Sequence, residues 1–262
     1  MWVKKEFPLI QGYESLGDSV EAKRFVDFKL SQLLDTGDPV WQFRSKLKSR
    51  EEVCSFVIVE FDYPFHYGVP TDKHTLNWFD GNCCHRITED YWQTASETLM
   101  TLAINQRKGK KGYGDCEDTS ALFTTLFLEK KWHAYMCLGY LLQDGQILGG
   151  HGFPIFEDEK GKWRLYESTL SIAPEYPDGY PIIVPRAGDW TVNGLTYRAL
   201  IEFSRKEYYE REEVENLISK FLKLGIVGNK AARKKFEAIS RAWGQKAKPL
   251  QKVSLLSKLR WR

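Results

Sequence analysis

The stretch "GYGDCEDTS", which runs from Gly112 to Ser120, places a cysteine among three carboxylates directly before a helical pattern. The pattern continues as "ALFTTLFLEKK" over residues 121–131, with apolar side chains spaced to form one helix face. A helix N-terminus stabilises a thiolate through its unpaired N–H groups and its dipole. We expect Gly112 and Gly114 to let the chain turn tightly before the helix. The stretch therefore predicts a reactive thiol, Cys116, in the first turn of a helix.

The three acids beside this cysteine, Asp115, Glu117 and Asp118, have more than one use. Carboxylates at a helix start pair with the exposed N–H groups, which makes capping the leading interpretation. Asp118 could instead hydrogen-bond a neighbouring loop, and several carboxylates on one turn could hold a hard cation such as Ca²⁺. Three anions also raise the pKa of a nearby thiol. An imidazolium, the helix dipole and the lysines at 108, 110 and 111 would have to outweigh them.

Three strand patterns separated by short turns follow the helix, at residues 133–142, 150–157 and 162–168. Short turns predict antiparallel neighbours. His151 lies at the start of the second pattern and Glu167 near the end of the third. Adjacent strands can therefore bring the imidazole beside a carboxylate that holds its tautomer. A helix-borne cysteine, a strand-borne histidine and a strand-borne acid are the parts that nucleophilic catalysis by a thiol requires.

This order and its surroundings resemble the transglutaminase-like superfamily, a branch of the papain-like cysteine enzymes. The resemblance covers residues 110–170 in four segments, "GYGDCEDTSALFTTLF", "KKWHAYMCLGY", "HGFPIFE" and "KWRLYEST". The GDCED form is similar to that of the bacterial transglutaminase-like cysteine proteinases. Two positions depart from the family pattern, since Glu167 stands where aspartate is usual and Gly152 stands where many members carry alanine.

By this resemblance, Cys116 is the nucleophile, His151 the general base and acid, and Glu167 the acid that orients the imidazole. The implied fold is α+β, with a papain-like core in which the nucleophile helix packs on an antiparallel sheet. The implied activity is hydrolysis of an amide bond in a protein or peptide substrate through a thioester acyl-enzyme. No cofactor is implied beyond the calcium on which some resembling proteinases depend.

Two other functions fit the same residues. In the first, a lysine amine replaces water and the product is an isopeptide cross-link. In the second, the chain is a structural or interaction protein that reuses the fold without catalysis.

The sequence does not single out one residue as the oxyanion stabiliser. In papain-like sites the stabiliser is usually the nucleophile's own N–H together with an upstream side-chain donor. Trp92 and Gln93, on a helix expected near residues 89–106 with Thr88 as its cap, are the candidates.

Five cysteines, an odd number at wide spacing, favour reduced thiols over a disulfide framework. "CCHR" at residues 83–86 invites a zinc site with Cys54, His66 or His74. However, no CxxC or HxxxH spacing is present, so loop thiols are favoured. His133 is a rival base, but its strand spacing to Cys137 fits a core or edge pair better.

The composition is that of a packed protein, with 42% hydrophobic and 14% aromatic residues, which excludes a disordered chain. The start of the chain lacks a long apolar segment and a cleavage site, and no apolar run reaches about 18 residues. We therefore expect no secretory signal, no membrane span and a cytoplasmic or otherwise intracellular setting. A place in a larger particle stays open.

The chain before the motif predicts two further elements. Residues 19–35 have a capping-box start at Asp18 and helical apolar spacing, with Gly37 as the expected stop. The dense β-branched and aromatic run "VCSFVIVEFDY" predicts a strand near residues 53–62. Residues 63–87, rich in turn-forming side chains, predict a long irregular connection.

The C-terminal segment differs from the rest of the chain in charge. Residues 205–262 hold 16 Lys and Arg and 6 Asp and Glu, whereas residues 1–204 hold the remaining 22 basic and 29 acidic side chains. We therefore predict a transglutaminase-like domain over residues 1–204 and a basic helical extension over residues 205–262. Two amphipathic patterns, at residues 209–225 and 229–244, predict a helical hairpin. Its charges form either a solvated face or a patch for an acidic partner or a nucleic-acid backbone.

Overall fold

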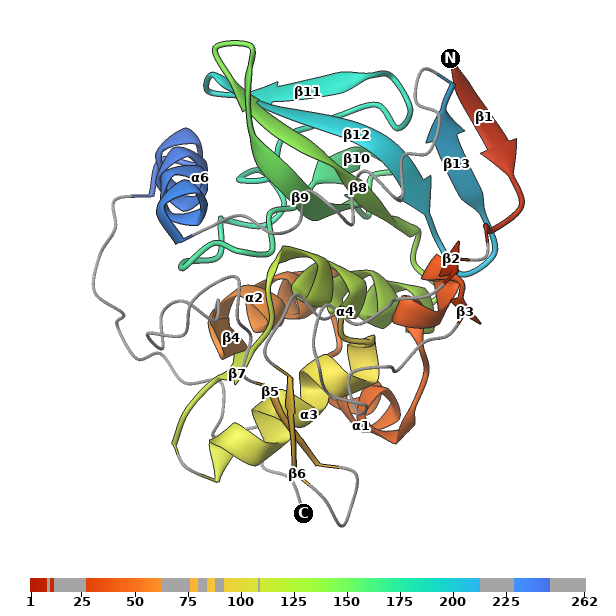
Figure 1. The fold of residues 1–262 in the computed structure, drawn as a ribbon, viewed down its shortest axis with the longest axis vertical. Coiled ribbons are helices and arrows are strands. Elements are labelled where there is room, and N and C mark those ends of the chain that lie inside the picture. The colour runs from red at the N-terminus through yellow and green to blue at the C-terminus, as the bar shows by residue number, and fades with distance from the viewer. Residues whose placement is uncertain are drawn as a thin grey trace.

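The computed structural model describes residues 1–8, 10–11, 27–62, 76–79, 84–87, 92–107, 109–212 and 229–245. Its central feature is a seven-stranded antiparallel sheet, with the N-terminal helices gathered against one face (Figure 1). The strands follow the order β1 (Trp2–Lys5), β13 (Tyr208–Arg211), β12 (Leu195–Phe203), β8 (Ala134–Gln143), β9 (Gln146–Glu157) and β10 (Trp163–Leu165). The seventh strand, β11 (Asp189–Val192), pairs with β12.

The helices are α1 (Asp38–Lys46), α2 (Arg50–Glu60), α3 (Ala95–Gln106), α4 (Cys116–Glu129) and α6 (Asn229–Ala242). Helix α4 lies between the sheet and the other N-terminal helices, and α6 lies beside the sheet next to β9 (Figure 1). The α+β prediction is confirmed, as is the packing of the cysteine-bearing helix on an antiparallel sheet. No helix in the described ranges is long and apolar enough to cross a bilayer.

Aromatic packing fixes α4 against the sheet. The Phe123 ring stacks on Tyr166 with ring centroids 3.8 Å apart and on Phe127 with centroids 4.5 Å apart. The Tyr166 hydroxyl donates to the Cys54 carbonyl of α2 at 2.8 Å, which ties the end of β10 to the helical layer. These buried contacts hold the N-terminal end of α4 beside β9.

The three strand patterns after α4 are confirmed as β8, β9 and β10. They are antiparallel neighbours, and β9 is central among them. The third is shorter than predicted, because β10 ends at Leu165. Glu167 therefore follows the strand rather than lying within it.

The strand predicted at residues 53–62 is wrong, because residues 50–60 form helix α2. The Ser49 side chain caps this helix by accepting from the Glu52 amide at 3.1 Å. Its apolar residues are buried on almost all sides, and a short run of that kind does not distinguish a buried helix from a buried strand. Only β4 (Phe61–Asp62) is extended, and it pairs in parallel with β7 (Gly112–Tyr113).

Two predicted helix boundaries also change. Of the helix expected at residues 19–35, the described part is a short strand, β3 (Asp27–Phe28), paired with β2 (Ile10–Gln11), and a 3₁₀ helix, Leu30–Leu34; the rest lies outside the described residues. Gly37 is the N-cap of α1 rather than a stop. Helix α3 begins at Ala95, because Thr94 and Glu97 form a reciprocal capping box.

The connection expected to be irregular at residues 63–87 contains a hairpin of β5 (Leu76–Phe79) and β6 (Cys84–Ile87).

In the C-terminal segment, β13 joins the main sheet between β1 and β12, so the first described strand or helix of the predicted helical extension is a strand. Helix α6 confirms the second helical pattern. The first pattern, at residues 209–225, begins in strand β13 rather than in a helix, and its part from residue 213 on lies outside the described residues, as does the predicted helical hairpin.

Candidate active site

The structure brings together the three residues that the sequence predicts for catalysis. Cys116 is the first residue of α4, His151 lies on β9 opposite Gly139 of β8, and Glu167 follows β10. The His151 Nε2 atom lies 2.8 Å from Glu167 Oε2, and both side chains are fully buried. The antiparallel pairing of β9 and β10 ends with Leu165 opposite Ile155, and Glu167 reaches His151 from the segment that follows β10.

Hydrogen bonds hold the Glu167 carboxylate in its charged form. Its Oε1 atom accepts from the Thr169 amide at 3.0 Å and from the Thr169 hydroxyl at 2.6 Å. Its Oε2 atom accepts from the Tyr197 hydroxyl at 2.8 Å, which in turn accepts from Trp243 Nε1 at 2.8 Å. Burial by itself raises the pKa of Glu167, but the charge of His151 and the bonds from Thr169 lower it below its usual value.

The other side of the imidazole faces the thiol. His151 Nδ1 is buried and accepts no conventional hydrogen bond from the described residues, so it is left to interact with Cys116. Burial lowers the pKa of His151, but the charges of Glu167 and Cys116 raise it to about 9. Burial raises the pKa of Cys116, but Lys235 and then His151 lower it below the ordinary thiol value. The geometry therefore favours a thiolate–imidazolium pair.

Lys235, on α6, is the residue that the sequence analysis missed. Its Nζ atom lies 3.9 Å from Cys116 Sγ and donates to the Gly150 carbonyl at 3.1 Å, and its side chain is buried. Of the lysines expected to help the thiolate, Lys111 pairs instead with Asp62 at 3.2 Å, and the lysine at position 108 lies outside the described residues. A signal was present, because Lys235 shares a helix face with the buried apolar residues Ala238, Ile239 and Ala242.

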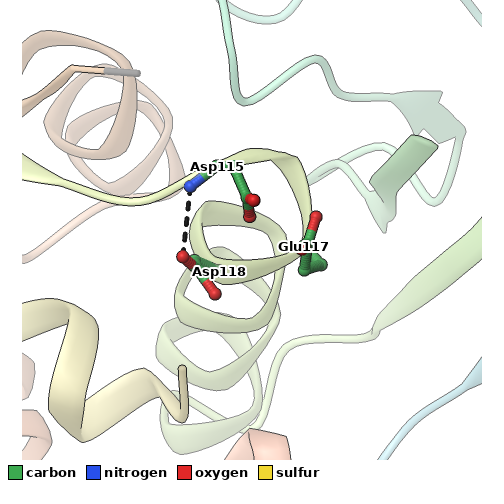
Figure 2. Close-up of side chains that lie close together, drawn as sticks. All are labelled: Asp115, Glu117 and Asp118. Atoms are coloured by element: carbon green, nitrogen blue, oxygen red, sulfur yellow. Dashed lines mark hydrogen bonds between the residues drawn. The ribbon is translucent and has the colours of Figure 1, made fainter. Parts of the chain in front are cut away.

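The first turn of α4 carries the acidic cluster Asp115, Glu117 and Asp118 (Figure 2). One oxygen from each lies within 4.8 Å of the others, close enough for a shared cation. Asp118 also caps the helix, since its Oδ2 accepts from the Asp115 amide at 3.1 Å. Glu117 Oε2 accepts from the Cys116 thiol at 3.1 Å, a contact that suits the neutral thiol and opposes the thiolate.

Gln93, one oxyanion candidate, is engaged with this cluster. Its backbone amide donates to Asp118 Oδ1 at 2.7 Å and its side-chain amide donates to Asp118 Oδ2 at 2.8 Å. Trp92 is buried in a hydrophobic cluster with Ala121 and Met136. Both residues precede α3 rather than lying on it. Their role toward an oxyanion stays a prediction, and the contacts of Gln93 join the start of α3 to the start of α4.

Glycines matter here for close packing rather than for turning. Neither Gly112 nor Gly114 has a positive φ, so the expected tight turn is not the reason for them. A Cβ at Gly114 would lie 2.7 Å from Asp118 Cβ. A Cβ at Gly152 of β9 would lie 2.9 Å from Glu117 Cα. These contacts let the first turn of α4 approach β9 closely enough for Cys116 to reach His151.

The remaining candidates lie away from this site. His133 is exposed, and its Nδ1 lies 2.7 Å from Glu157 Oε2, so it forms a surface pair rather than a catalytic base. Cys54 and Cys137 are buried free thiols. The other residues considered for zinc, His66, His74 and the side chains of Cys83 to His85, lie outside the described residues. Within the described ranges, the acidic cluster is the sole group with metal-site spacing.

No protein-family model matches the chain, and no curated protein matches it significantly. Among solved structures, it is similar to Legionella pneumophila LapG, with a TM-score of 0.37 and 15% identity over 81% of this chain and 94% of that one. The EGTA-treated form of LapG gives a TM-score of 0.35, 14% identity and coverages of 81% and 95%. The calcium-bound form gives a TM-score of 0.34 and 15% identity over 74% of this chain and 94% of that one. At these values the similarity assigns neither a family nor an activity to the chain, whose function is inferred from its own site geometry.

Proposed function

We propose that the protein is a cysteine-dependent hydrolase of the transglutaminase-like type that cleaves amide bonds in a protein or peptide. The observation that carries this proposal is the buried His151–Glu167 pair at 2.8 Å, with Cys116 close enough to the imidazole for each group to shift the pKa of the other. A buried histidine that is oriented by a carboxylate and lies beside a thiol at a helix start is the arrangement that activates a cysteine nucleophile.

In the first half of the reaction, the Cys116 thiolate attacks the carbonyl carbon of the substrate. The carbonyl electrons move to oxygen, and a tetrahedral intermediate forms. The His151 imidazolium then gives its Nδ1 proton to the leaving amine, and the carbon–nitrogen bond breaks. Glu167 stabilises the imidazolium throughout, because its own charge is held by Thr169 and Tyr197. The product of this half is a thioester on Cys116.

In the second half, His151 takes a proton from water, which attacks the thioester and releases the acyl group. A lysine amine in place of water would give an isopeptide bond instead, by the same proton transfers. Incubation with a glutamine-containing peptide and a fluorescent primary amine separates the two reactions. We expect hydrolysis of acyl donors without incorporation of the amine; incorporation that depends on Cys116 would show that the protein is an acyltransferase.

The acidic cluster suits a hard cation, and we propose that it binds calcium. One oxygen from each of the three carboxylates lies within 4.8 Å of the others, so all three can approach one ion. Carboxylate oxygens are the ligands that calcium prefers. The ion would supply positive charge where three buried carboxylates repel one another.

Calcium is therefore expected to raise the thermal unfolding midpoint by several degrees, because it binds the folded chain and not the unfolded one. The measurement is a thermal melt with excess calcium and with EGTA, on the wild type and on Asp115→Asn. We expect the shift to be smaller in the variant. Equal midpoints with calcium and EGTA in the wild type would leave helix capping and the contacts of Asp118 with Gln93 as the roles of the cluster.

A further inference from the structure

Lys235 is a buried charge that the three-residue mechanism does not use. Its side chain is 4% exposed, although lysine is among the residues that are almost never fully buried unless they are paired. No carboxylate of the described residues forms an ion pair with it. A buried ammonium without an anion beside it is costly, and the charge nearest to Lys235 is that of the Cys116 thiolate, whose sulfur lies 3.9 Å away.

Helix α6 holds this lysine in place from both sides. Phe236 and Ile239 pack in the main core, and the Ala242 carbonyl accepts from Asn193 Nδ2 at 2.6 Å. Directly after the helix, Trp243 donates to Tyr197, which donates to Glu167. The helix thus contacts Cys116 through Lys235, and the residue that follows it is linked to Glu167 through Tyr197.

The partners of the ammonium leave one direction for a ligand. An ammonium has three N–H donors. Among the described residues, one N–H of Lys235 points to the Gly150 carbonyl at 3.1 Å and one to Cys116 Sγ at 3.9 Å. Its other contact in that part of the chain is with the Phe236 ring, whose centroid lies 5.5 Å from Nζ, so the third N–H has no oxygen or sulfur acceptor there. The Gly150 carbonyl thus fixes the ammonium beside the sulfur without neutralising it.

The distance to sulfur suits a group that contacts the oxygen of a tetrahedral intermediate. That oxygen is bonded to the carbon that the sulfur attacks, and its donors lie about 2.7–3.1 Å from it. The distance from such a donor to the sulfur is therefore longer than that of a short, direct hydrogen bond to the sulfur. Lys235 Nζ meets this condition, whereas the side-chain amide of Gln93 is already bound to Asp118.

We propose that Lys235 is a further catalytic residue, whose ammonium stabilises the oxyanion formed when Cys116 attacks a carbonyl. This inference rests on the proposed function. The ammonium donates a hydrogen bond and keeps its proton while the carbonyl electrons move to oxygen. When the intermediate collapses, the electrons return, and the proton for the leaving group comes from His151. Because the positive charge is preorganised and buried, the stabilisation is stronger than it would be in water.

Two reactions of the same thiolate separate this role from others. Acylation by p-nitrophenyl acetate passes through a tetrahedral oxyanion, whereas alkylation by iodoacetamide does not. Both rates depend on the fraction of Cys116 that is thiolate and on its accessibility, so their ratio does not depend on either. We expect Lys235→Met to lower this ratio by about 10²-fold, in line with the loss of an oxyanion donor. Lys235→Arg keeps the charge and is expected to retain most of the ratio. Lys234→Met, at the exposed neighbouring position, is the control and should leave it unchanged.

Each outcome has a distinct meaning. If both rates of Lys235→Met fall by the same factor, Lys235 supports only the thiolate and the oxyanion role is wrong. If neither rate changes, the residue has no catalytic role. If Cys116→Ser is acylated as fast as the wild type, the proposed function itself fails. Circular dichroism confirms folding before each comparison, and Lys235→Gln replaces Lys235→Met if the latter does not fold.

Discussion

Replacing His151 with glutamine is expected to lower the rate of Cys116 acylation by about 10²–10⁴-fold, the range that general acid–base catalysis contributes. Glutamine can still donate to Glu167 but cannot carry the positive charge that pairs with the thiolate or move a proton to a leaving group. Both roles depend on the buried 2.8 Å contact between His151 and Glu167, which holds the imidazole in one tautomer. Release of p-nitrophenol from p-nitrophenyl acetate measures the rate.

The exposed histidine, His133, provides a matched control. Its imidazole pairs with Glu157 on the surface, so His133→Gln should leave the acylation rate unchanged. A His151→Gln variant that is folded and acylated within about threefold of the wild-type rate would contradict the assignment of His151 as the base.

Replacing Gly152 with alanine is expected to lower both stability and activity. The added Cβ would lie 2.9 Å from Glu117 Cα, 3.1 Å from Glu117 N and 3.3 Å from the Cys116 carbonyl carbon. All three are backbone atoms, so no side-chain rotation relieves the contact and the start of α4 must move away from β9. Overpacking of this kind costs about 1–3 kcal/mol of unfolding free energy. The shift also carries Cys116 away from His151, and we expect at least a tenfold slower acylation, since about 1 Å of misplacement can cost about 10²-fold.

Gly145→Ala separates the two effects. Gly145 lies in the turn between β8 and β9 with φ +76° and no atom near the added Cβ, so its substitution costs stability through backbone strain alone. Urea unfolding and the acylation rate are measured on both variants. We expect the acylation rate of Gly152→Ala alone to fall by more than the fraction of unfolded protein accounts for. Equal acylation rates in the two variants would show that the close approach of α4 to β9 is not needed for catalysis.

The order of the site could be predicted because its signals are local. The glycines, the cysteine and the helical pattern are contiguous, and the two strands that carry His151 and precede Glu167 are joined by a short turn. Antiparallel pairing then brings the histidine and the acid together with little freedom. The same reasoning was wrong about Gly112 and Gly114, because a sequence does not show whether a glycine is needed for its φ or for the space that a side chain would fill.

Other parts of the structure depend on contacts between distant residues. Helix α2 was predicted as a strand because its burial, on almost all sides, removes the periodic pattern that identifies a helix. Lys235 was missed because 84 positions separate it from His151 and no local motif marks it. The sequence places it on the apolar face of the second C-terminal helical pattern, but only the structure shows that this face packs against β9. Charged residues inside a predicted core face are therefore useful candidates for site residues.

The most direct test of the central claim, that His151 together with Lys235 keeps Cys116 as a thiolate, is ultraviolet absorbance at 240 nm at pH 6. Burial raises the pKa of both Cys54 and Cys137 well above the ordinary value, so these thiols stay protonated at this pH. The account predicts that the wild type absorbs more than Cys116→Ser by the amount of one thiolate, and that the excess is lost in His151→Gln. Equal absorbance of the wild type and Cys116→Ser at pH 6 would contradict it.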